Sequence, residues 1–62
     1  MPIVENIRRY ASEQKLSLTQ IEVNSGLGNG TIGKWNKSKP TVETLLKVAN
    51  TLGCSIEDLL KD

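Results

Sequence analysis

Residues 17–35 contain two short amphipathic segments separated by a glycine turn, and this arrangement restricts the fold more than any other part of the chain. Ser17 is followed three residues later by Gln20, a spacing typical of a capping box that begins a helix. Gly26 supplies a residue that readily adopts the left-handed conformation in which a helix ends. We therefore expect two short helices joined by a tight turn at the centre of the chain.

The second of these helices is expected over about residues 29–36, with Gly28 or Asn29 as its N-cap. At 100° per residue, Ile32 and Trp35 point toward the core together with Thr31. The opposite face has no hydrophobic side chain and consists of Asn29, Gly30, Gly33, Lys34 and Lys37. This helix therefore presents a sparse polar surface to the outside.

The rest of the chain also shows helical spacing of its apolar residues. A first helix is expected over residues 3–14, a fourth from the cap Thr41 to Gly53, and a short fifth one from Ser55. Because no segment alternates with a period of two, the sequence predicts an all-α fold of five helices. The residues expected to face inward are Ile3, Val4, Ile7, Tyr10, Ala11, Leu18, Ile21, Ser25, Leu27, Ile32, Trp35, Val42, Leu45, Leu46, Val48, Ala49, Leu52, Ile56, Leu59 and Leu60.

The length and the residue types exclude several functional classes. A chain of 62 residues is expected to form one domain, residues 1–62, with little room for a substrate cleft. Cys54 is the only cysteine and there is no histidine, so we expect no internal disulfide, no zinc, no cofactor, no small-molecule substrate and no enzymatic activity. No apolar run reaches the length of a signal-peptide core or a membrane span, which favours a cytoplasmic protein.

The charge is small in total but unevenly distributed. The net charge is +1, yet residues 29–41 contain Lys34, Lys37 and Lys39 without any acidic residue. Residues 42–62 carry two lysines and four acidic residues, which sum to −2. Positive charge is thus concentrated beside the expected helix over residues 29–36. Taken alone, it fits a nucleic-acid partner and a merely solubilising surface equally well.

Residues 28–33 read GNGTIG and match the G-x-G-x-x-G pattern of dinucleotide-binding loops. That fingerprint requires a preceding strand and a βαβ unit, whereas a capped helix precedes it here. Two readings remain for Gly30 and Gly33. Positions without side chains allow close approach to a groove floor or a phosphate, or they reflect drift on a solvated surface.

The order and spacing of these residues resemble the Cro and phage-repressor type of helix-turn-helix, the xenobiotic-response-element (XRE) family of small DNA-binding domains. The resemblance spans nearly the whole chain. It implies a five-helix, lambda-repressor-like domain in which the third helix enters the major groove and the second lies across the backbone. The residues that carry it are Ile7, Tyr10, Leu16, Ser17, Ile21, Gly26, Leu27, Thr31, Ile32, Trp35, Pro40, Thr41, Val42, Glu43, Thr44, Leu45, Ala49, Leu52, Gly53, Ser55, Ile56, Glu57, Asp58, Leu59 and Leu60.

The resemblance also implies roles for individual positions. The base-facing positions are Asn29, Gly30, Gly33 and Lys34, with Thr31 at the flank, and the phosphate-facing positions are Ser17, Thr19, Lys37 and Ser38. These residue types suit the roles, because asparagine can pair with adenine, lysine can donate to guanine, and a helix N-terminus attracts phosphate.

Two positions depart from the family pattern. Glu22 stands where a small residue usually packs against the third helix, and Ser25 stands where an apolar residue is common. Both place polar atoms near the crevice between the second and third helices. Because an unpaired buried carboxylate is costly, we expect Glu22 to accept hydrogen bonds from the amides at the start of the third helix or to pair with a basic side chain.

The leading hypothesis is a sequence-specific regulator of transcription that binds double-stranded DNA, either a phage or bacterial repressor or the N-terminal domain of one. Tight binding to an operator with two half-sites about one helical turn apart would require a homodimer, associated with the nucleoid in the cytoplasm. The alternative is a helix-turn-helix scaffold that serves as a protein-interaction or antitoxin-like adapter module. The near-neutral charge and the glycine-rich face keep this alternative open.

Overall fold

A computed structural model describes residues 3–61, and these residues form helices and loops without any strand. The predicted all-α fold is confirmed, but within this range four segments are α-helices and the third of the five segments is a 3-10 helix. The prediction of one domain includes residues 1, 2 and 62, which lie outside the described range, and it stays a prediction. The segments are α1 (Ile3–Glu13), α2 (Leu18–Asn24), η1 (Ile32–Asn36), α3 (Val42–Leu52) and α4 (Ile56–Leu60).

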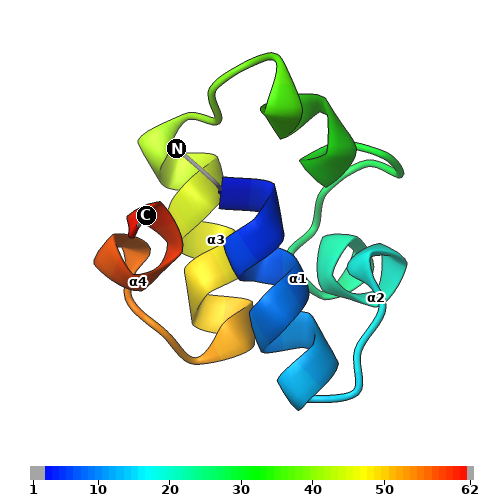
Figure 1. Ribbon diagram of the computed structural model, residues 1–62. Helices are drawn as coiled ribbons and strands as arrows, with labels where there is room; N and C mark the ends of the chain where they lie inside the picture. The colour runs from blue at the N-terminus through cyan, green and yellow to red at the C-terminus, as the bar shows by residue number, and fades with distance from the viewer. Residues whose placement is uncertain (1–2, 62) are drawn as a thin grey trace.

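The five segments enclose one small core. α1 packs against α2, η1 and α4, while α3 packs against α2 and α4. Figure 1 shows α2 and η1 on one side of the molecule and α4 on the other. Each segment contributes at least one side chain that is fully buried, and the largest of these are Ile7, Ile21, Ile32, Val48 and Leu59. Every segment therefore depends on the others for its burial, as expected of so short a chain.

Two capping boxes begin α2 and α4; the box at Ser17 was predicted, and at Ser55 only the start of the helix was. The amide of Gln20 donates to the hydroxyl oxygen of Ser17 over 3.1 Å, and the Ser17 amide donates back to Oε1 of Gln20 over 2.9 Å. Ser55 and Asp58 repeat this exchange with two bonds of 3.1 Å. These bonds satisfy amides that a helix N-terminus otherwise leaves without a partner.

α3 begins and ends where the sequence predicts, but its buried face is narrower. The Thr41 hydroxyl accepts from the Thr44 amide over 3.2 Å, and Gly53 ends the helix in the left-handed region with φ of 72°. Val42 and Leu46, which were expected in the core, are 73% and 46% exposed. The expectation was wrong because the apolar arc of α3 is wider than its buried face, which consists of Leu45, Val48, Ala49 and Leu52.

The helix expected over residues 29–36 is shorter and different in type. Gly28, Asn29 and Gly30 belong to a turn, and the 3-10 helix begins only at Ile32. Its N-cap is Thr31, without a side-chain cap, so the prediction of Gly28 or Asn29 as the cap was wrong. The physical reason is the backbone of Gly30, whose φ of +82° lies in the left-handed region and cannot belong to a right-handed helix.

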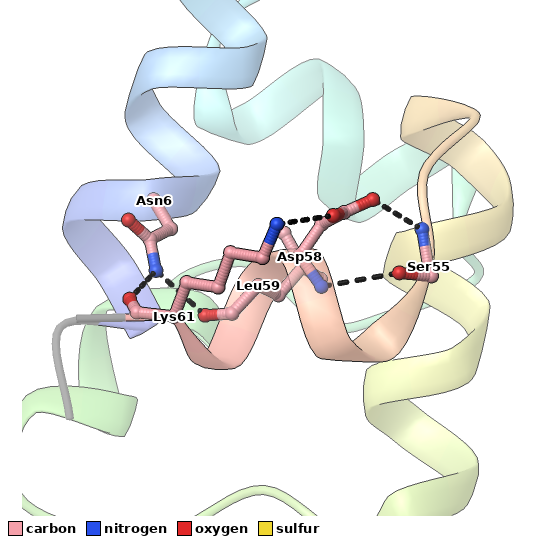
Figure 2. A network of polar contacts seen from close by, with 5 residues as sticks. All are labelled: Asn6, Ser55, Asp58, Leu59 and Lys61. Carbon is pink, nitrogen blue, oxygen red and sulfur yellow. Dashed lines mark hydrogen bonds and ion pairs between the residues drawn. The ribbon is translucent and has the colours of Figure 1, made fainter.

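Two side-chain amides from the α1 region close the C-terminal ends of the last two helices. The side-chain nitrogen of Asn6 donates to the main-chain oxygens of Leu59 and Lys61, over 2.9 and 2.6 Å (Figure 2). Gln14, just after α1, donates to the main-chain oxygen of Leu52 over 2.6 Å. Asn6 was not predicted from the sequence to have this role; it is only 6% exposed, on a helix face otherwise occupied by apolar residues.

Candidate nucleic-acid interface

The nine residues predicted to contact DNA lie on the side of the molecule formed by α2 and η1 (Figure 1). Eight of the nine are exposed and Thr31 is half-buried. Contact of these residues with DNA stays a prediction. Ser17 and Thr19 lie at the start of α2, Asn29, Gly30 and Thr31 in the turn before η1, Gly33 and Lys34 within η1, and Lys37 and Ser38 just after it.

Glu22 joins α2 to the start of η1. Its side chain is buried, with 3% of its surface exposed. One carboxylate oxygen accepts from the Gly30 amide over 3.1 Å, and the other accepts from the Ile32 amide over 2.9 Å. The expectation that Glu22 binds the amides at the start of the third helix is confirmed. Two charge-assisted hydrogen bonds compensate for the burial of its charge.

The turn between α2 and η1 is held by further main-chain bonds. The Leu27 amide donates to the main-chain oxygen of Glu22 over 2.8 Å, which ends α2. The Thr31 amide and hydroxyl both donate to the main-chain oxygen of Gly28, over 3.2 and 2.7 Å. The amides of Gly30, Thr31 and Ile32 are therefore all engaged within the protein. These three amides are therefore not available to bind a phosphate.

Ser25 contacts a different element from the one expected. Its hydroxyl oxygen lies 2.8 Å from that of Thr51 on α3, rather than in the crevice between α2 and η1. Because the Thr51 hydroxyl donates to the main-chain oxygen of Lys47 over 3.0 Å, Ser25 is the donor in the bond to Thr51. The buried hydroxyl of Ser25 therefore has a hydrogen-bond partner.

The N-terminus of α2 offers hydroxyl groups to a partner. The hydroxyl oxygen of Ser17 accepts from Gln20 within the capping box, and its own proton stays available for donation. Thr19 lies in the first turn and is exposed. Both hydroxyls are placed where the positive end of the helix dipole favours an anion.

The segment after η1 carries exposed positive charge. Lys34, Lys37 and Lys39 are exposed and form no salt bridge within the described part of the chain. The amides of Lys37 and Ser38 donate to the main-chain oxygen of Lys34, over 3.0 and 2.9 Å, so the start of this loop is held against η1. Three exposed lysines thus lie within six residues of the chain, and residues 29–41 contain no acidic residue.

The side chain of Trp35 is half-buried against the core, as its position on the inward face predicts. It also lines a shallow groove of about 170 Å³ between Ile3 and residues 36–39, which the sequence analysis did not anticipate. Among residues 3–61, acidic and cysteine side chains form no cluster that could hold a metal ion, and no helix is long and apolar enough to cross a membrane.

Comparison with known proteins identifies the family of this chain. Residues 6–62 match the model of a family described as the Cro/C1-type HTH DNA-binding domain. No curated protein matches this chain. The match includes all nine residues predicted to contact DNA and both partners of the Glu22 carboxylate.

Proposed function

Because this chain belongs to the Cro/C1-type helix-turn-helix DNA-binding family, we propose that it is a sequence-specific regulator of transcription that acts as a repressor. The match of residues 6–62 to that family carries the proposal. The regulator reads the major groove of double-stranded DNA with the segment over residues 29–36, and it acts at the nucleoid in the cytoplasm. The exposure of the residues predicted to contact DNA, on the side of α2 and η1, supports this function.

Base contacts come from the turn and from η1. Asn29 and Lys34 have long enough polar side chains to reach base edges, where asparagine suits adenine and lysine suits guanine. Gly30 and Gly33 let the backbone approach the groove floor. Thr31 contributes less to base contacts, because its hydroxyl proton is already donated to the main-chain oxygen of Gly28.

Phosphate contacts come from the flanks of this segment. Ser17 and Thr19 donate hydroxyl protons from the start of α2, while Lys37 and Ser38 contribute from the loop after η1. Because Gly30, Thr31 and Ile32 use their amides internally, phosphate binding depends on these side chains. Such contacts make affinity dependent on salt, with a slope of about −0.9 per phosphate neutralised.

Tight binding requires a homodimer on two half-sites about one helical turn apart. Val42 and Leu46 are exposed apolar residues one turn apart on α3, and they offer a surface that a second copy can cover. Sedimentation of the protein with and without its duplex will show whether two copies assemble on one operator.

The test begins with selection of bound sequences from random duplexes at two salt concentrations. The double variant Lys34→Ala/Lys37→Ala is then compared with Lys47→Ala/Lys61→Ala, which removes the same charge from α3 and from the end of α4. We expect the first variant to lose DNA binding and the second to retain it, with both folded by circular dichroism. Equal binding by the two variants would favour the adapter function instead.

A further inference from the structure

The reading segment has little of its own to hold its shape. η1 has five residues and no side-chain cap at its N-terminus. A Cβ atom built on Gly30 or Gly33 would have no neighbour within 4 Å, so neither position packs against the rest of the protein. Glycines in such a segment add conformational freedom that folding must restrict. The fully buried Ile32 anchors η1, but the turn over residues 28–31 needs another residue to define its path.

Glu22 is in the position to do so. Its two carboxylate oxygens bind the amides of Gly30 and Ile32, which bracket Thr31, and Gly30 immediately follows Asn29. α2 anchors Glu22 from the other side, since the preceding residue, Ile21, is fully buried. The carboxylate thus connects a fixed helix with the turn before η1 and with the amide of Ile32, whose side chain is anchored in the core.

We propose that Glu22 is a positioning residue for DNA recognition, which fixes the turn carrying Asn29 and the start of η1 before DNA binds. This inference rests on the proposed function. A segment that is already ordered loses less conformational entropy on binding, so its preorganisation raises affinity. Glu22 itself is buried and contributes no contact to the partner.

Because Glu22 is acidic, the proposal predicts a change in DNA affinity opposite in direction to the change that electrostatics alone predicts. Removing an acidic residue from a DNA-binding protein reduces repulsion from phosphates and by itself strengthens binding. Glu22→Gln removes the charge with little change of shape, but its amide group offers one acceptor oxygen where the carboxylate offers two. Its NH₂ group would then face one of the two backbone amides. Positioning therefore predicts weaker binding, and electrostatics alone predicts the opposite.

The experiment compares wild type with Glu22→Gln and with Glu13→Gln, a matched loss of one charge at an exposed position of α1. Dissociation constants are measured on the selected duplex. We expect Glu13→Gln to bind as well as wild type or slightly better, and Glu22→Gln to bind about tenfold more weakly or worse. Equal affinity of the two variants overturns the positioning role of Glu22 but not the proposed function. Failure of wild type to bind any duplex at low salt overturns the proposed function and this inference with it.

Amide hydrogen exchange separates positioning from general stabilisation. In free Glu22→Gln, exchange should quicken at Gly30 and Ile32 while Ile21 and Val48 keep the protection of wild type. A merely structural role would lower protection throughout. If Glu22→Gln does not fold, hydrogen exchange of the wild-type protein still tests the proposal. Slow exchange at the amides of Gly30 and Ile32 that does not change on adding DNA supports it, and unprotected exchange at both amides overturns it.

Discussion

Asn6 of α1 holds the carbonyl end of α4 by donating to the main-chain oxygens of Leu59 and Lys61 from one side-chain nitrogen. α4 has only five residues, too few to be stable by itself in water. Its attachment therefore depends on the hydrogen bonds of this buried amide, drawn in Figure 2, and on the burial of Leu59 in the core.

We expect Asn6→Ala to lower the free energy of unfolding by about 1–3 kcal/mol, because two carbonyl groups lose a buried donor. Urea denaturation will measure this difference. Asn50→Ala, at an exposed position of α3, serves as the control and should have little effect. A loss for Asn6→Ala no larger than that of Asn50→Ala would contradict the assigned role.

Gly33→Ala should stabilise the free protein and weaken DNA binding. Gly33 has no left-handed φ, and a Cβ atom there meets nothing within 4 Å, so alanine should be favoured by about 0.5–1 kcal/mol. If Gly33 faces the groove closely, the added methyl group should reduce affinity by about tenfold, equivalent to about 1.4 kcal/mol.

Gly30→Ala provides the comparison, because φ at Gly30 is +82° and alanine there is strained by about 1–2 kcal/mol. Thermal unfolding and duplex titration of both variants will check the two effects. Unchanged affinity in a stabilised Gly33→Ala protein would show that Gly33 does not approach the DNA.

Asp58 should make the stability of the α4 cap sensitive to acid. The backbone hydrogen bond from Ser55 lowers the pKa of Asp58, and the Ser55 side chain and Lys61 lower it further. Because the pKa is lower in the folded state, the stabilisation is complete well above the unfolded pKa of about 4 and is lost as the pH falls through the folded value. Stability measured between pH 6 and pH 2 should fall less in Asp58→Asn than in wild type, and identical profiles would contradict this assignment.

Cys54 should react slowly with alkylating reagents. Partial burial raises the pKa of its thiol, and the charge of Asp58 raises it further, so less thiolate is present at pH near 8. We expect iodoacetamide to modify native Cys54 more slowly than the same cysteine in urea. Asp58→Asn should speed the native reaction modestly, whereas the exposed substitution Glu57→Gln is the matched control for charge. A native rate equal to that in urea would refute the expectation.

Much of the fold follows from short-range signals in the sequence. The capping residues Ser17, Thr41 and Ser55 begin their helices as predicted, and Gly53 ends α3 in the left-handed region. These signals are readable because each involves residues three or four positions apart, whose geometry is set by the local backbone. The bonds of Glu22 were predictable for a related reason: a buried carboxylate near a helix start has few other partners.

Other features depend on which segments meet in space. The sequence alone placed Gly30 inside a helix, assigned Val42 and Leu46 to the core, and did not anticipate the partners of Asn6 or Ser25. The exposure of Val42 and Leu46 is decided by the neighbours of α3, and the bond from Ser25 to Thr51 by the packing of α2 on α3. Local periodicity determines which face of a helix is apolar, but only the tertiary structure determines how much of that face a neighbour covers, because burial depends on contacts between residues far apart in the chain.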